Sequence, residues 1–355
     1  MSLGSGVSGS SLGGRRVRLA DWPGAAGFSP QALLGALAWG QAPLPYEAAS
    51  LQAPALPPAQ AQLDAWLTDG PLRTGQTGRV RWQHNGEWMF GVLDLDEAAL
   101  GQDLQALARE AYLDVFASLA ASPCPQLLRV WNYLPDINAE QAGLERYRQF
   151  NIGRQQAFLQ AGRAAFEGAP AACALGTRSG PLSVRFLAGR VAPLAIENPR
   201  QTPAYRYPND YGPSSPSFSR AALFDAGGGQ VALMISGTAS IVGHDSCHPG
   251  DVGAQTEETL RNLHALIEAA RLSTDAALTL RELCATVYVR QAEDAPAVRE
   301  VLTRALGADS PCLQSLVLLQ ADVCRQELRV EIEAHGLAAG HILAQDEMSH
   351  TEGAR

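Results

Sequence analysis

The sequence predicts an α/β protein in which two similar layers of mixed sheet and helix lie within one chain. Segments typical of β-strands alternate with segments that have the apolar spacing of amphipathic helices, and they do so in both halves of the 355 residues. Hydrophobic residues make up 46% of the chain and charged residues 18%, the balance of a globular protein. We expect a disordered leader over residues 1–24, an N-terminal domain over 25–175, a C-terminal domain over 176–345 and a tail over 346–355.

Each element of the first half follows from a local pattern. Residues 25–71 are rich in Ala, Pro and Gln, and they predict short helices and loops. Alternating residues on both sides of the pair Asn85 and Gly86 predict a β-hairpin with strands at 79–84 and 88–95. Beyond the hairpin we expect a helix over 103–121, a strand over 127–133 and a long helix over 139–166.

The second half repeats this arrangement. Strands are expected at 182–187, 219–224, 231–236, 282–290, 313–319 and 328–334, and helices at 255–271 and 295–306. Residues 196–220 hold five prolines and four aromatic residues, which prevent a helix and stiffen the segment. A long loop of this kind is usually functional, so we expect it to border the active site.

Composition excludes several classes of function. All 27 basic residues are arginine, so enzymes that need a lysine (Schiff-base aldolases, pyridoxal-phosphate enzymes, Walker-type phosphate loops) are ruled out. A net charge of −9 argues against binding to nucleic acid or to anionic lipid. Because no apolar run approaches the ~20 residues that cross a bilayer, we expect no membrane partner.

The six cysteines are scattered and form no CxxC pair, a pattern typical of reduced thiols in the cytoplasm. His244, Cys247 and His248 lie close together in the sequence, but their spacing matches no standard zinc site. We therefore expect neither a metal ion nor another cofactor, and either a monomer or a small homo-oligomer.

Arginine-bearing elements are the best candidates for binding an anionic substrate. Guanidinium groups from two of them could hold a dicarboxylate through paired hydrogen bonds, although each arginine alone is more typical of a solvated surface residue. The candidates lie on the helix after residue 139, in the proline-rich loop and in the C-terminal part: Arg148, Arg154, Tyr205, Tyr211, Arg290 and Arg304.

Two further segments carry candidate residues. Small residues around Gly237 let a ligand approach the backbone closely. In the last predicted strand, Glu331 and Glu333 share one face while Val330 and Ile332 point the other way. A carboxyl on such a strand is either partly desolvated, which makes it a usable acid, or simply solvent-facing.

Four blocks of the sequence resemble the chorismatase family, which includes chorismate hydrolases and 3-hydroxybenzoate synthases. They are YRQFNIGR (147–154), PRQTPAYRYPNDYGPSSPSFSRA (199–221), ISGTASIVGHDSCHPGD (235–251) and the VEIEA segment at 330–334. The likeness runs from about residue 130 to 336. The C-terminal half is also similar to the RidA/YjgF fold, but the active-site arginine of that family is not matched near 313–316.

The resemblance implies an enzyme that needs no cofactor and cleaves chorismate to pyruvate and a ring product. Glu331 would be the acid, and Arg148, Arg154, Arg290 or Arg304 would hold the carboxylates, helped by Tyr205, Tyr211 and Gly237. Family members with cysteine at the position of Cys324 resemble 3-hydroxybenzoate synthases, so we expect 3-hydroxybenzoate with some 4-hydroxybenzoate. Cys324 is otherwise a plain core thiol.

Three alternatives remain open from the sequence. A chorismate hydrolase would release a dihydroxycyclohexadiene carboxylate instead. A deaminase-like hydrolase is disfavoured by the missing arginine. A non-catalytic protein that senses small anions would keep the same arginine and tyrosine pocket.

Overall fold

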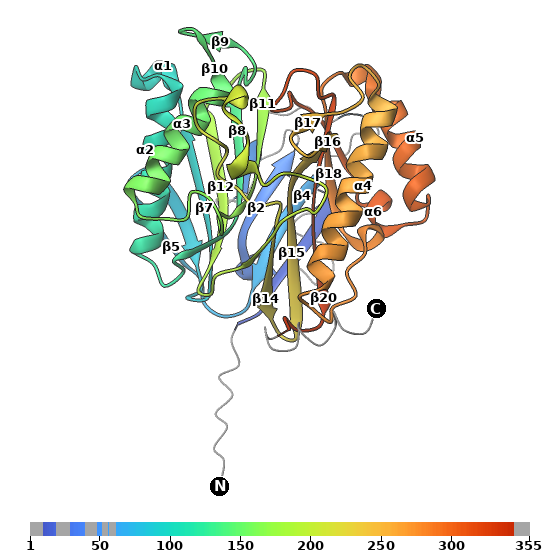
Figure 1. The fold of residues 1–355 in the computed structure, drawn as a ribbon. Helices are drawn as coiled ribbons and strands as arrows, with labels where there is room; N and C mark the ends of the chain where they lie inside the picture. The colour runs from blue at the N-terminus through green and yellow to red at the C-terminus, as the bar shows by residue number, and fades with distance from the viewer. Residues whose placement is uncertain (1–9, 19–28, 40–47, 52–55, 57–61, 344–355) are drawn as a thin grey trace.

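The computed structural model describes residues 10–18, 29–39, 48–51, 56 and 62–343. Two six-stranded sheets face each other in the middle of the molecule, and helices cover the outer side of each sheet (Figure 1). The prediction of two layers of mixed sheet and helix is therefore confirmed. The predicted tail, 346–355, lies outside the described residues.

The first layer has the strand order β11-β8-β12-β7-β6-β5, with β11 and β8 parallel and the other neighbours antiparallel. Its strands are β5 (Arg73–Thr77), β6 (Val80–His84), β7 (Trp88–Leu95), β8 (Gln126–Pro135), β11 (Ala171–Thr177) and β12 (Leu182–Gly189). Its helices are α1 (Glu97–Leu100), α2 (Leu104–Ala120) and α3 (Arg146–Gln160). The hairpin at Asn85 and Gly86 is confirmed, and Gly86 takes the positive φ of 100° that its turn requires.

Two details of this layer differ from the prediction. The helix expected over 139–166 begins only at Arg146, because β9 (Glu140–Gln141) and β10 (Leu144–Glu145) form a small hairpin first. Its turn places Ala142 at φ 53° and Gly143 at φ 79°, a left-handed conformation that a helix cannot include. The domain boundary predicted at 175 falls inside β11, and β12 pairs with β7 and β8. The layers therefore divide after Gly189.

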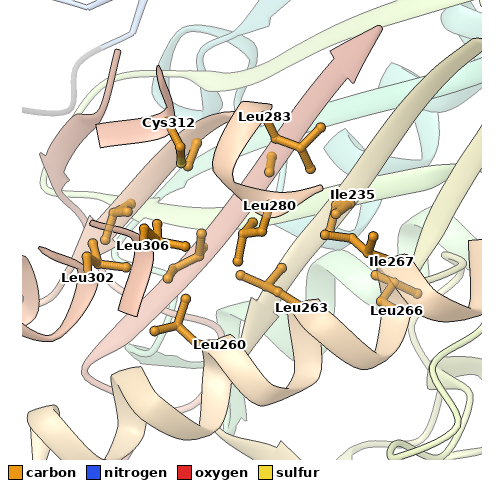
Figure 2. Close-up of a cluster of buried hydrophobic side chains, with 14 of the residues drawn as sticks. Ile235, Leu260, Leu263, Leu266, Ile267, Leu280, Leu283, Leu302, Leu306 and Cys312 are labelled. Carbon is orange, nitrogen blue, oxygen red and sulfur yellow. The ribbon is translucent and has the colours of Figure 1, made fainter. Parts of the chain in front are cut away.

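The second layer has the order β13-β14-β15-β20-β18-β19, with only β18 and β19 parallel. Its strands are β13 (Leu194–Ile196), β14 (Ala221–Gly227), β15 (Gln230–Ala239), β18 (Cys284–Val289), β19 (Val317–Gln320) and β20 (Val330–Ala339). Its helices are α4 (Val252–Arg271), α5 (Ala295–Leu306) and α6 (Pro311–Gln314). Figure 2 shows the apolar face of α4, with Leu263 and Ile267, packed on the sheet beside Ile235.

A third sheet in the N-terminal region was not predicted. It has the order β1-β4-β2-β3, with strands β1 (Leu12–Arg18), β2 (Leu33–Trp39), β3 (Ala48–Leu51) and β4 (Gln62–Thr68). The disordered leader is therefore wrong for residues 12–18, which pair along β4, and the short helices expected over 25–71 are wrong where β2, β3 and β4 run. Trp39 and Trp66 from this sheet join one core cluster with residues of both six-stranded sheets.

The proline-rich loop contains two short 3-10 turns, η3 (Ala204–Arg206) and η4 (Asn209–Tyr211). A two-residue pair, β16 (Ile241–Val242) and β17 (Asp245–Ser246), follows β15. Gln201 and Gly243 form an isolated bridge, so the loop is tied by its backbone to the end of β15. The loop is thereby held over one end of the two layers.

The buried pair of Arg16 and Asp64 fastens the third sheet to the second layer. Arg16 Nε donates to Asp64 Oδ1 at 2.5 Å, Nη2 donates to Thr286 Oγ1 at 2.8 Å, and Nη1 donates to the carbonyl oxygen of Ser315 at 2.9 Å. The two side chains are only 2% and 4% exposed. Removing one member of such a pair leaves the other charge buried without a partner.

We predict that Arg16→Met lowers the free energy of unfolding by about 3–5 kcal/mol in urea denaturation. The matched control is Arg190→Met, because the ion pair of Arg190 with Glu87 is exposed and is expected to contribute less than about 1 kcal/mol. Equal effects of the two substitutions would contradict the structural role of Arg16.

Candidate active site

The site is organised by β20, whose residues alternate between two environments. Val330 and Ile332 pack in the core cluster beneath the helices of the second layer. Glu331 and Glu333 point the other way, into the space between the two six-stranded sheets, and each is only 4% exposed. Of the two expectations for this strand, the desolvated carboxyl is the one that the structure has.

Glu331 is set up to hold a proton at neutral pH. Burial raises the pKa of Glu331 to about 8, and the charge of Glu333 adds to the increase, while Arg129, Arg220 and Arg290 act against it. Among the described residues, none donates a hydrogen bond that would favour the ionised carboxylate of Glu331. At neutral pH the buried carboxyl group of Glu331 is therefore expected to be protonated and uncharged.

Glu333 has a different environment. Arg129, on β8 of the opposite sheet, forms an ion pair with its Oε2 atom, and the Tyr288 hydroxyl donates to Oε1 at 2.8 Å. The hydroxyls of Tyr133 and Tyr288 are 2.6 Å apart, which extends the network across the two sheets. Both carboxyl oxygens of Glu333 therefore have a hydrogen-bond partner.

Gly237 leaves room for the acid. The ladder between β15 and β20 shifts register between Ile235 and Thr238, so Gly237 lies at an irregularity opposite β20. A β-carbon at this position would lie 1.9 Å from Glu331 Oε1 and 3.3 Å from the β-carbon of Cys173. Any residue larger than glycine would displace the carboxyl group.

A pocket of about 420 Å³ opens in front of this acid. It is bordered by the β9–β10 hairpin with the start of α3, by the proline-rich loop and by the loop before β20. Its lining residues include Asn138, Glu145, Tyr147, Arg148, Tyr207, Tyr211, Cys324, Arg325 and Glu327. The structure thus brings together predicted residues from three separate segments.

Glu331 itself is not part of the pocket lining. Tyr147 and Cys324 line the pocket, and both interact electrostatically with the carboxylate of Glu331. Burial raises the pKa of Cys324 to about 12, so its thiol is neutral at physiological pH and is not an activated nucleophile. Its role is therefore one of shape and polarity.

Arg154 is a buried cation without a counter-ion among the described residues. It is 2% exposed, and its Nε and Nη2 atoms have no hydrogen-bond partner there. Its guanidinium group packs over the rings of Tyr112, at 5.0 Å, and Phe158, at 5.6 Å. An unpaired buried guanidinium is costly, so this one indicates a site for an anion.

Helix α3 places Arg154 in the interior through its buried polar side chains and its close contact with α2. It buries polar side chains such as Gln149, Asn151 and Arg154 rather than a purely apolar stripe. Gly153 permits a close approach of α2, because a β-carbon there would lie 2.0 Å from the carbonyl oxygen of Gln105. Arg148, half-exposed on the same helix, contacts Glu145 at 3.4 Å and lines the pocket.

Two functional candidates were missed from the sequence. Arg325 lies over the ring of Tyr211 at 3.9 Å, and its Nη2 atom is buried without a partner among the described residues. Its Nη1 atom donates to the carbonyl oxygen of His244 at 2.8 Å. Tyr207 also lines the pocket and accepts a hydrogen bond from Arg220 Nη2 at 2.7 Å. Arg325 could have been recognised in the sequence from its position directly after Cys324, which was already a candidate residue.

Three predicted binding residues need correction. Tyr205 is not among the pocket residues, because the η3 turn directs Tyr207 there instead. Arg304 is an exposed residue of α5, paired with Glu257 and Glu300 on the outer surface. Arg304 is therefore not placed to bind a ligand in this pocket, whereas Tyr205, like Arg154, lies outside its lining.

Arg290 has no guanidinium nitrogen left for a substrate. Its Nε donates to the carbonyl oxygen of Leu328 at 2.9 Å, its Nη1 to Asp322 at 2.5 Å, and its Nη2 to the carbonyl oxygen of Arg325 at 3.0 Å. Arg290 instead fixes the loop that carries Cys324 and Arg325.

Within the described ranges, no three His, Cys, Asp or Glu residues come together in a way that could hold a metal ion. A search of the same residues finds no helix with the length and apolar character needed to span a membrane.

Comparison with known proteins gives consistent results. The family model for the chorismatase FkbO/Hyg5-like N-terminal region matches residues 64–188. A 3-hydroxybenzoate synthase of Streptomyces hygroscopicus is 38% identical over 288 residues, which cover 78% of this chain and 82% of that protein. A chorismatase of Streptomyces rapamycinicus is 35% identical over 277 residues, covering 76% and 80%. A chorismatase crystal structure superposes with a TM-score of 0.80 at 29% identity, covering 92% of this chain and 99% of that one. This chain therefore belongs to the chorismatase family.

Proposed function

We propose that this protein cleaves the enolpyruvyl ether of chorismate to pyruvate and 3-hydroxybenzoate. The observation that carries the proposal is the buried acid Glu331, which lies behind a pocket whose surroundings include an unpaired guanidinium. The relative from Streptomyces hygroscopicus named 3-hydroxybenzoate synthase supports the same reaction. The reaction rearranges the atoms of chorismate without net oxidation or reduction, so we propose no cofactor.

Chorismate is a dianion, and the site offers cations for both of its carboxylates. Arg154 would bind one carboxylate with its two free nitrogen atoms, and Arg148 and Arg325 would bind the other at the mouth of the pocket. Tyr207 and Tyr211 would support the ring and the outer carboxylate. In this arrangement, anion binding compensates for the cost of burying Arg154.

Glu331 would start the reaction by protonating the terminal methylene carbon of the enol ether. The resulting oxocarbenium ion weakens the ether bond, and the Glu331 carboxylate left by the proton transfer is a negative charge beside it. The arginines hold the substrate carboxylates and thereby fix the geometry. The oxygen of the neighbouring ring hydroxyl then bonds to the ether-bearing ring carbon as the C–O bond to pyruvate breaks, which gives an arene oxide, and the hydroxyl proton returns to the Glu331 carboxylate. The other C–O bond of the arene oxide then opens, and aromaticity is restored as the ring carbon loses its proton and the oxygen gains one. The two products together hold the same atoms as chorismate, so no water is consumed.

We further propose that Cys324 favours this route by limiting the space for water beside the reacting carbon. The thiol is neutral and largely apolar, and it lies at the boundary between the pocket and the acid. A smaller side chain would leave room for a water molecule, and water would then give a dihydroxycyclohexadiene carboxylate. A minor yield of 4-hydroxybenzoate is part of the same proposal.

The free thiols support a reducing compartment. All six cysteines are unpaired, and Cys124, Cys173 and Cys312 are buried. We therefore propose that the protein acts in the cytoplasm, as a monomer or a small homo-oligomer.

We predict that Glu331→Gln lowers kcat by about 10²–10⁴-fold while chorismate still binds, because glutamine fills the same space but donates no carboxylic proton. Pyruvate release measures turnover, and titration calorimetry measures binding. For the wild type, kcat/KM should fall as the pH rises through about 8, because Glu331 then loses its proton. The control is Glu282→Gln at the exposed η5 turn (Leu280–Glu282). A fully active Glu331→Gln variant would remove Glu331 from the mechanism.

We predict that Arg154→Met weakens chorismate binding by about 10- to 100-fold, the range expected for a lost charged hydrogen bond. The free energy of unfolding should not fall, because no protein ion pair is broken. Arg304→Met is the matched control and should leave KM unchanged, since Arg304 is on the outer surface. If KM were the same in both variants, Arg154 would not bind a carboxylate.

We predict that Cys324→Ala shifts the ring product from 3-hydroxybenzoate toward the dihydroxycyclohexadiene carboxylate, as measured by chromatography after complete turnover. Cys247→Ala serves as the control, because Cys247 is not part of the pocket lining. An unchanged product ratio in Cys324→Ala would refute the steering role of the thiol.

A further inference from the structure

The inner face of β20 carries two carboxyl groups in succession. Glu331 and Glu333 are two residues apart, and their backbone positions are separated by about 6.6–7 Å along the strand. The ladder between β20 and β18 is regular here, with Tyr288 opposite Glu331 and Thr286 opposite Glu333. The spacing between the two carboxyl-bearing residues is therefore fixed by the sheet.

The charge of Glu333 is also fixed. Arg129 forms an ion pair with it from the opposite sheet and itself packs over the ring of Trp131 at 5.2 Å. Tyr288 donates the second hydrogen bond. Because the carboxyl of Glu333 is buried, solvent screens its negative charge only weakly.

The groups that face Glu331 come from every surrounding element. The cations are Arg129 from β8, Arg220 from the segment before β14 and Arg290 from the end of β18. The neutral groups are Cys173 from β11, Tyr147 from α3 and Cys324 from the loop before β20. Among the groups that act on Glu331, Glu333 supplies the negative charge.

We propose that Glu333 is a positioning residue for the proton of the reaction: its fixed negative charge keeps the proton on Glu331 between turnovers. The inference rests on the proposed function of Glu331 as the acid.

The asymmetry between the two carboxyls decides which one holds the proton. Two buried carboxyl groups on successive inward positions of one strand do not readily ionise together. Glu333 has Arg129 and Tyr288 to stabilise its ionised form, whereas Glu331 has no donor among the described residues. The proton therefore stays on Glu331, the carboxyl nearer the pocket.

The same repulsion would act during turnover. When Glu331 gives its proton to the enol carbon, the two neighbouring residues are both charged. The Glu331 carboxylate then becomes a stronger base, and it takes the proton of the ring hydroxyl more readily. Glu333 would thus support the step in which the hydroxyl replaces water.

The test is the pH profile of kcat/KM for Glu333→Gln, measured by pyruvate release. We expect the high-pH limb to move to lower pH by at least about one unit, because removing the like charge favours ionisation of Glu331. The activity on the low-pH plateau should stay within a few-fold of the wild type. Tyr288→Phe is the matched control, since it removes a hydrogen bond to Glu333 but keeps every charge, and its limb should not move.

A second variant covers the case in which Glu333→Gln does not fold, because Arg129 would be left buried and unpaired. Arg129→Met combined with Glu333→Gln removes both charges. Because Glu333 shares the inner face of β20 with Glu331 whereas Arg129 reaches Glu333 from the opposite sheet, the limb should still move to lower pH, but by less. A limb at the wild-type position in this double variant would overturn the inference.

A measurement without turnover separates the two proposals. The carboxyl signal of Glu331, assigned in ¹³C NMR by its loss in Glu331→Gln, should titrate at lower pH when Glu333 is replaced by glutamine. An unchanged titration would overturn the role of Glu333, whatever the activity. A wild-type protein that releases no pyruvate, with a titration that still shifts, would instead refute the proposed function alone.

Discussion

The ion pair between Arg129 and Glu333 is the interaction on which the site depends. Arg129 belongs to the first layer and Glu333 to the second, 204 residues later in the chain. A buried pair of this kind adds little net stability, but breaking it is expensive, so it restricts how the two sheets can face each other. The same contact fixes the charge beside Glu331. The packing of the layers and the chemistry of the acid therefore share one constraint.

The buried arginines have different tasks, and their hydrogen bonds distinguish them. Arg290 and Arg16 have several protein acceptors each, and they hold a loop and a sheet in place. Arg154 and Arg325 retain buried nitrogen atoms without protein partners in the part of the chain that the structure describes. All basic residues of this chain are arginine, so the same type of residue stabilises the fold at some positions and is proposed to bind an anion at others.

Local periodicity predicted the direction of Glu331 and the presence of a helix around Arg154, whereas the proposed role of Glu331 as the acid came from the resemblance to the chorismatases. Alternation in the last strand placed Glu331 opposite Val330 and Ile332, and Arg154 was recognised beside Arg148. The partner of Glu333 could not be predicted, because pairing across two sheets leaves no local pattern. Tyr205 was predicted as a binding residue in place of Tyr207 for a similar reason. In an irregular loop, the direction in which a side chain points is set by the 3-10 turn and not by the spacing of residues in the sequence. The strands of the third sheet were missed because apolar runs such as β2 have no helix-like or strand-like period of their own.

The pocket is lined by segments from both layers of a single polypeptide. Enzymes whose active sites form at subunit boundaries lose specific activity when dilution separates the subunits. Here the groups around the pocket remain covalently connected through one backbone. Each copy of the chain therefore supplies all of these lining residues itself.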